Sequence, residues 1–123
     1  MFVFHDPPFP SCHASSILRT SSGACVVACF GGSREGAADV RIYCARAEAD
    51  GMFAPPVRIE AKPDTPHSNP VLYSPAAGQL LLYFKAGTTI YNWQTYVCVS
   101  RDDGRTFSAP RELVPGDVSG GRG

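Results

Sequence analysis

The residues most suited to catalysis or ligand binding lie in a glycine-rich stretch, residues 30–39, which carries Arg34, Glu35 and Asp39. Glycines let the backbone bend and approach a ligand closely. An arginine offers paired donors to a carboxylate, and a partly desolvated carboxyl group can act as a general acid. The alternative is that Arg34 pairs with Glu35 or Asp39 and only stabilises the loop. A phosphate loop is not indicated, because no Gly-Lys-Ser/Thr and no helix follow.

Four further polar residues are candidates for the same site. His13 and His67 begin two similar segments, and Asn69 and Lys85 belong to the second of them. Two interpretations are open for the histidines: they line a pocket, or they hydrogen-bond a neighbouring unit and set its packing. Trp93 is likewise either a platform on which a sugar stacks or an aromatic residue of the core.

The elements that must position these residues are strands of an internal repeat. Matching segments are residues 13–18 and 67–72 at an offset of 54, then 25–30 and 80–85, and 40–44 and 95–99, at an offset of 55. This alignment also matches Arg46 with Arg101. Each unit consists of four short apolar runs separated by Gly- and Pro-rich turns, which is the pattern of a four-stranded blade of about 50 residues. We therefore predict an all-β fold with two four-stranded antiparallel sheets near residues 12–59 and 66–113, packed face to face, without a helix.

The best-defined turn spans residues 100–107, with the sequence Ser-Arg-Asp-Asp-Gly-Arg-Thr-Phe. Asp102 can accept hydrogen bonds from backbone N–H groups of the turn, and Gly104 can take a positive φ. Phe107 is an apolar residue that can pack beneath it. The stretch resembles the Asp-box, S-x-D-x-G-x-T-W/F, which marks hairpins in the β-propellers of sialidases and related BNR-repeat proteins.

Several motifs together resemble the first two blades of the bacterial BNR-repeat, sialidase-like family. They are His-Ala-Ser at 13–15, Phe-Gly-Gly-x-Arg-Glu-Gly at 30–36, Asn-Pro-Val-Leu at 69–72 and Lys-x-Gly at 85–87. This resemblance covers nearly the whole chain. It implies a sialidase-like β-propeller, six-bladed when complete, of which two blades are present.

The resemblance also implies roles for individual residues. Arg34 and Asp39 match, by spacing, a ligand-binding arginine and the acid/base aspartate of sialidases, so Asp39 is the expected catalytic general acid. His13 stands where sialidases carry an arginine that binds the substrate carboxylate, which leaves the identity of the sugar open. The expected substrate-binding residues are Arg34, Glu35, His13, His67, Asn69 and Lys85. The nucleophilic tyrosine and its glutamate partner would lie in later blades.

The composition limits the classes of molecule that the protein is expected to bind. The 123 residues include 11 basic and 11 acidic side chains, so no polybasic surface for nucleic acid or a membrane is indicated. The start of the chain lacks a basic region followed by a long apolar run, so we expect no signal peptide and a cytoplasmic location. The five cysteines lie mostly in apolar runs, which favours buried thiols over disulfides. We expect no metal and no cofactor, and the oligomeric state stays open.

The expected organisation is an extended lead-in at residues 1–11 and a propeller domain at 12–123. Because two blades do not close a propeller, the sequence is interpreted as the N-terminal part of a longer protein. The expected activity is exo-acting hydrolysis of a glycoside, similar to that of an exo-α-sialidase. Two alternatives remain: a non-catalytic carbohydrate-binding propeller, and a structural repeat in which the loop charges only hold blades together. The sequence leaves open whether the chain is catalytic.

Overall fold

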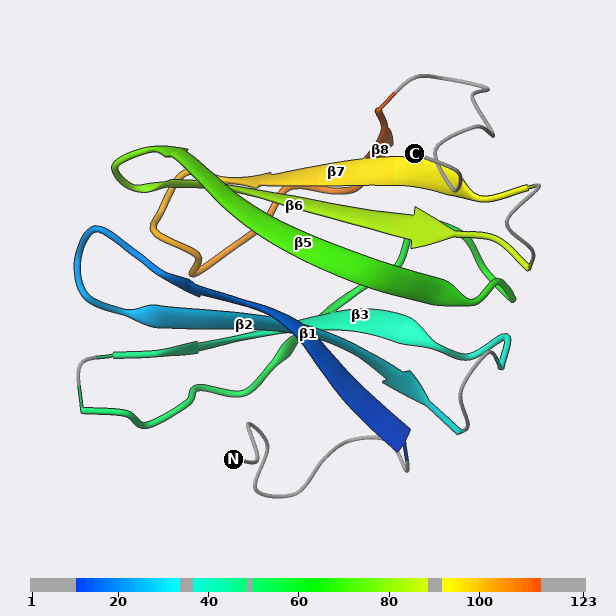
Figure 1. Cartoon of the computed structure of the whole chain (residues 1–123), viewed down its shortest axis with the longest axis horizontal. Coiled ribbons are helices and arrows are strands. Elements are labelled where there is room, and N and C mark those ends of the chain that lie inside the picture. Colours follow the sequence, from blue (N-terminus) through cyan, green and yellow to red (C-terminus); the bar gives the residue numbers. More distant parts are fainter. Residues whose placement is uncertain (1–10, 34–36, 49, 89–91, 114–123) are drawn as a thin grey trace.

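The computed structural model describes residues 11–33, 37–48, 50–88 and 92–113, and for residues 11–15 it describes the backbone only. Eight strands form two antiparallel sheets in which neighbours in sequence are neighbours in space (Figure 1). The first sheet contains β1 (Ser11–Arg19), β2 (Cys25–Gly32), β3 (Arg41–Ala47) and β4 (Val57–Ile59). The second contains β5 (His67–Ala76), β6 (Gln79–Ala86), β7 (Gln94–Ser100) and β8 (Arg111–Glu112). The predicted pair of four-stranded sheets is confirmed.

Within the described residues there is no helix, and therefore none long and apolar enough to cross a membrane.

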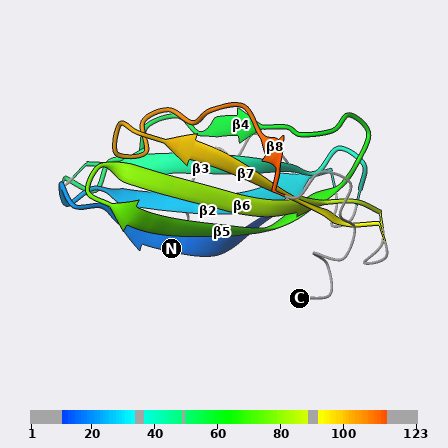
Figure 2. The ribbon, with the colours of Figure 1, turned by 90° about the horizontal axis from the view of Figure 1, so that it is seen from above.

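The two sheets pack face to face and enclose one main core (Figures 1 and 2). Val26, Ala28 and Ile42 of the first sheet meet Leu82 and Phe84 of the second, and all five are fully buried or nearly so. Side chains alternate between the faces of a strand, so the intervening residues of β2 and β6 point away from this interface. Burying each large side chain contributes roughly 1.5–3 kcal/mol.

The connections between strands divide between two ends of the sheets. The end that carries the β2–β3, β4–β5 and β6–β7 connections, called here the β2–β3 end, lies on the right in Figure 1. The opposite end, called here the turn end, carries the other four connections. Gly23, Gly78 and Gly104 adopt positive φ values there, of 91°, 77° and 88°. Glycine suits these turns because it has no Cβ to clash in a left-handed conformation.

A buried ion pair joins the sheets at the turn end. Arg46 of β3 donates from Nη2 to the carboxylate of Asp103 at 2.9 Å and from Nε to the Asp103 carbonyl at 2.8 Å. Thr20 and Ser22, in the β1–β2 connection, donate to the same carboxylate. These donors, together with the Arg46 charge, lower the pKa of Asp103 despite its burial. Asp103 therefore fixes the second sheet's turn onto the first sheet.

The neighbouring Asp102 holds the turn itself together, as predicted. Its carboxylate accepts hydrogen bonds from the Thr106 N–H at 2.9 Å and from the Ser100 hydroxyl at 2.9 Å. Gly104 donates its N–H to Ser100 Oγ, also at 2.9 Å. Phe107 is half-buried and packs against the main core, as expected.

The strand register corrects the repeat alignment by one residue at the first strand. The turn glycines Gly23 and Gly78 relate β2 to β6 at an offset of 55, which makes Phe30 equivalent to Lys85. His13 pairs with Phe30, whereas the residue that pairs with Lys85 is Ser68. His13 is therefore equivalent to Ser68 and not to His67. The predicted equivalence of the two histidines was wrong. The alignment was off by one residue, and side chains one residue apart in a strand point to opposite faces of the sheet.

A second correction concerns β3 and β7. Phe30 pairs with Ile42, and Lys85 pairs with Thr95, so these two strands correspond at an offset of 53. The equivalent of Arg46 is then Val99 and not Arg101. The reason is that the path from Lys85 to Thr95 is two residues shorter than the path from Phe30 to Ile42.

Candidate functional site

Asp39, the expected general acid, lies exposed in the β2–β3 connection. Its two carboxylate oxygens each lie 3.1 Å from the Ser33 N–H, which donates to them, and the Ser33 hydroxyl donates at 3.0 Å. The backbone hydrogen bond from Ser33 lowers the pKa of Asp39, and the nearby charge of Arg41 lowers it further. The carboxylate is therefore held in its ionised form and closes the loop, whereas a general acid must carry a proton. Catalysis by Asp39 stays a prediction.

Arg41, at the start of β3, is a residue that sequence reasoning missed. It is 4% exposed, and its Nε donates to Glu60 at 2.6 Å. Its Nη1 donates to the carbonyl oxygens of Ala38 at 2.7 Å and Thr65 at 2.9 Å. Arg41 thus ties the β2–β3 connection to the β4–β5 connection and supports the loop that carries Asp39. The signal in the sequence was a charged residue between two apolar ones, Val40 and Ile42.

His67, at the start of β5, is fully buried between the sheets. Its Nε2 accepts a hydrogen bond from the Ala61 N–H at 3.0 Å, so Nδ1 carries the proton and donates to the Thr65 carbonyl at 2.7 Å. The ring stacks on Phe84 with 5.6 Å between centroids, and burial lowers the pKa of His67 to about 4. Its backbone N–H donates to Val40 of the first sheet at 3.1 Å. Both ring nitrogens are used internally, so this histidine organises packing between the sheets.

Asn69 and Lys85 lie at the same end. Asn69 is exposed, with φ of 52°, within a bulge of β5. Lys85 is half-buried and donates to Thr95 Oγ1 at 3.3 Å. Lys85 pairs with Ser68, the residue after His67, so it lies on the opposite face of the second sheet. The candidates that the structure describes therefore share one end of the sheets without forming one cluster.

A small hollow of about 180 Å³ opens at the β2–β3 end, where the two sheets meet. Its lining includes two aromatic residues, two hydroxyl-bearing residues and His67. The lining residues are Phe30, Val40, Pro66, His67, Ser68, Gly87, Thr88 and Trp93. Asp39, next to Val40 in the chain, lies beside this hollow and does not line it. Aromatic side chains with a few hydroxyl groups are typical of small-molecule sites.

The remaining expected residues are only partly described. His13 is placed by its backbone in β1, and Arg34 and Glu35 lie outside the described residues. In the part of the chain that the structure describes, no group of three or more His, Cys, Asp or Glu could hold a metal ion. Cys29, Cys44 and Cys98 are buried, as predicted, and burial raises the pKa of Cys44 and Cys98 to about 12. Cys44 and Cys98 are therefore unsuited to ionise as nucleophiles or metal ligands.

Comparison with known proteins shows one matching family and a similar solved structure. The family described as BNR repeat-like domain matches residues 23–120. Among solved structures, the Hadza microbial sialidase Hz136 is similar, with a TM-score of 0.71 and 15% sequence identity over 85% of this chain. The match covers 26% of the sialidase, so this chain spans about a quarter of its length. At this identity the likeness shows the fold alone, a sialidase-like arrangement of antiparallel sheets. No curated protein matches the sequence.

Proposed function

This chain belongs to the BNR repeat-like domain family, and from that premise we propose that it supplies part of the substrate pocket of a sialidase-like exo-glycosidase. Its two sheets are blades of a sialidase-like β-propeller fold. The proposal concerns the whole protein, of which the chain would provide one side of the pocket. Asp39 would be the general acid, with Asn69 and the undescribed side chains of Arg34, Glu35 and His13 near the substrate.

The observation that carries this proposal is the hollow at the β2–β3 end. Trp93 is half-buried there, and the hydroxyl-bearing residues Ser68 and Thr88 also line the hollow. The apolar face of a sugar ring can pack on an aromatic side chain, while its hydroxyl groups need hydrogen-bonding partners. A hollow of about 180 Å³ is smaller than a complete ligand pocket, so it suits one edge of a sugar.

Catalysis by Asp39 requires a change in its surroundings. The Ser33 hydrogen bonds favour the carboxylate, so a bound substrate would have to displace one of them or raise the pKa by excluding water. Arg41 anchors the same connection through the carbonyls of Ala38 and Val40, so the loop has a fixed base on which such a change could occur. His67 and Lys85 would then act as positioning residues rather than as substrate ligands.

The same Ser33 contacts favour one alternative, a carbohydrate-binding propeller without catalysis. In that case Asp39 would only close the β2–β3 connection, and the hollow around Trp93 would account for the function. The two proposals share the binding surface and differ in what Asp39 does.

The deciding experiment compares Asp39→Asn with Asp50→Asn in the full-length protein. Asp50 lies exposed at the turn end, so its variant is a matched control for loss of a charge. If Asp39 is the general acid, kcat on an unactivated glycoside falls at least about 100-fold, with a smaller loss on an activated aryl glycoside. Unchanged hydrolysis by Asp39→Asn would overturn its catalytic role. No hydrolysis by the wild type, with glycan retention that Trp93→Ala abolishes, would establish the binding propeller.

A further inference from the structure

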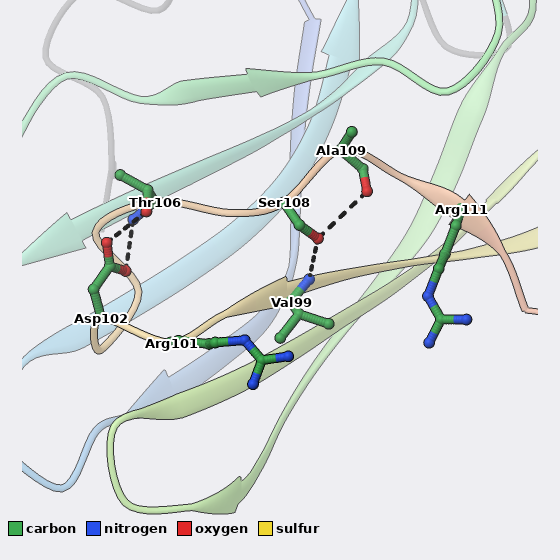
Figure 3. A pocket seen from close by; sticks show the side chains of 7 residues that line it. All are labelled: Val99, Arg101, Asp102, Thr106, Ser108, Ala109 and Arg111. Atoms are coloured by element: carbon green, nitrogen blue, oxygen red, sulfur yellow. Dashed lines mark hydrogen bonds between the residues drawn. The ribbon is translucent and has the colours of Figure 1, made fainter.

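Two arginines of the second sheet stand out because they lack a partner among the described residues. Arg101 and Arg111 make no hydrogen bond or ion pair within that part of the chain, and both are exposed. Both line a hollow of about 680 Å³ on the face of the second sheet that points away from the first. Figure 3 shows their guanidinium groups directed to the same side, flanking Val99. The other described arginines, Arg19, Arg41, Arg46, Arg58 and Arg105, all donate hydrogen bonds.

The first sheet has a hollow at the equivalent position, beside Arg46, and the residues that fill it indicate what the hollow of the second sheet could bind. Ala54 donates its N–H to the Arg46 carbonyl at 2.9 Å, and Ser108 donates to the Val99 carbonyl at 2.8 Å. These matching hydrogen bonds confirm that Arg46 and Val99 are equivalent, as the register indicates. The hollow beside Arg46 is smaller, about 320 Å³, and its walls include Gly104 and Arg105 from the turn of the second sheet. In the first sheet, therefore, a turn from the neighbouring repeat occupies this place.

The turn of the second sheet contacts charged residues of the first sheet that are complementary to its own. Arg46 pairs with Asp103 at 2.9 Å, and Glu48 faces Arg105, whose Nη2 lies 3.5 Å from Glu48 Oε1. The first sheet thus offers Arg46 to Asp103 of the turn and Glu48 to Arg105. Complementary charges of this kind select a partner more than they add affinity.

The second sheet offers a different set of charges at the equivalent positions. The offset of 53 places Arg101 where the first sheet has Glu48. Cys44 pairs with Val57, and its equivalent Val97 pairs with Arg111, so Arg111 replaces Val57. Both arginines add positive charge to the hollow. It also contains the Asp102 carboxylate, which already accepts hydrogen bonds from Ser100 and Thr106. A turn with an arginine at the place of Arg105 would meet Arg101 instead of a glutamate and would be repelled.

We propose that the hollow around Arg101 and Arg111 receives an acidic turn from another repeat of the same kind, with a carboxylate where this chain carries Arg105. An exposed apolar side chain close to the hollow supports a packed turn over a free ion, because Leu113, two residues after Arg111, is 45% exposed. Unlike a simple anion site, the hollow is also lined by the apolar residues Val99 and Ala109. This inference is independent of the proposed catalysis.

The test is an NMR titration of the 123-residue chain with two cyclic peptides that copy residues 99–108. One peptide carries Arg105→Glu, and the matched control keeps Arg105. The backbone amide of Val99 and the Nε–H groups of Arg101 and Arg111 report binding. We expect the acidic peptide to bind at least about tenfold more tightly, because the control places like charges together.

Two protein variants test whether the two arginines cause this preference. Arg101→Gln/Arg111→Gln should lose the preference for the acidic peptide, whereas Arg58→Gln, in β4 of the first sheet, should keep it. Unchanged amide signals of the core would show that the double variant is folded. Equal binding of both peptides, or a preference that survives in the double variant, would overturn the proposal. So would the same shifts with glutarate at equal concentration, since the hollow would then be a simple anion site.

Discussion

Arg46 and Asp103 lie 57 residues apart in the sequence and form an ion pair of 2.9 Å that joins the two sheets. Their side chains are nearly buried, at 8% and 11% exposure. Removing Asp103 leaves the buried Arg46 charge with Glu48, which is 60% exposed, as its remaining charged partner among the described residues. We expect Asp103→Asn to lower the free energy of unfolding by about 3 kcal/mol, measured by urea denaturation. Asparagine is the suitable replacement because it tolerates the φ of 66° found here.

The control for this prediction is the double variant Arg46→Met/Asp103→Asn. It removes both charges, so its loss of stability should be smaller than the sum of the single losses. A change below about 0.5 kcal/mol in Asp103→Asn would show that the ion pair does not hold the sheets together.

The sequence predicted both sheets because their signals are local. Apolar runs define the strands, and turn glycines such as Gly23 and Gly78 mark where the chain reverses. The register was harder to predict from the sequence, since it depends on bulges and on the path between the paired residues of β6 and β7, which is two residues shorter than in the first sheet. Because of those small differences, His13 is not equivalent to His67, and Arg46 is not equivalent to Arg101.

The candidate site was only partly predictable for a different reason. The partners of Arg41 include the carbonyls of Ala38 and, in another connection, Thr65, and no residue pattern marks a carbonyl as an acceptor. Asp103 was overlooked beside Asp102 because its partners, Thr20 and Arg46, are distant in the sequence. Asp102 was predicted correctly because its hydrogen bonds stay within the turn.

Asp102→Ala should destabilise the protein by about 1 kcal/mol at pH 7, as the loss of a capping carboxylate does. The hydroxyl of Thr106 is the main cause that lowers the pKa of Asp102 to about 2. A carboxyl group with a lowered pKa stabilises the fold above its ordinary pKa of 3.8 and loses this effect as the pH falls towards 2. The difference between wild type and variant in urea should therefore shrink between pH 4 and pH 2. A constant difference would assign the loss to packing alone.

Gly104→Ala should be more destabilising than Gly78→Ala. Both glycines have similar positive φ values, of 88° and 77°, so the backbone strain is shared and amounts to roughly 1–2 kcal/mol. A Cβ at Gly104 would lie 2.8 Å from Cγ2 of Val26, whereas a Cβ at Gly78 would meet no described atom within 4 Å. We expect an extra loss of about 1–3 kcal/mol for Gly104→Ala. Equal melting temperatures of the two variants would show that the turn does not pack against Val26.

His67 should make the stability of the protein depend on pH between about 6.5 and 4. Burial lowers the pKa of His67 from 6.5 to about 4, and both Arg41 and Glu60 lie close enough to affect it. Above pH 6.5 the ring is neutral in the folded and unfolded chains, so it adds no pH dependence. As the pH falls below 6.5, the unfolded chain takes up a proton that the folded chain excludes, so the free energy of unfolding falls until the folded ring titrates near 4.

The measurement is urea denaturation of wild type and His67→Gln at pH 8, 6, 5 and 4.5. The variant should be less stable at pH 8, because it disturbs the hydrogen bonds to Ala61 and Thr65. Its stability should then decline less than that of the wild type, and the difference isolates His67 from the other titrating groups. In the folded wild type, the NMR signal of the His67 ring should stay constant from pH 8 to pH 5. A midpoint between pH 6 and 7 would show that the ring is accessible to protons and would return His67 to the candidates for substrate binding.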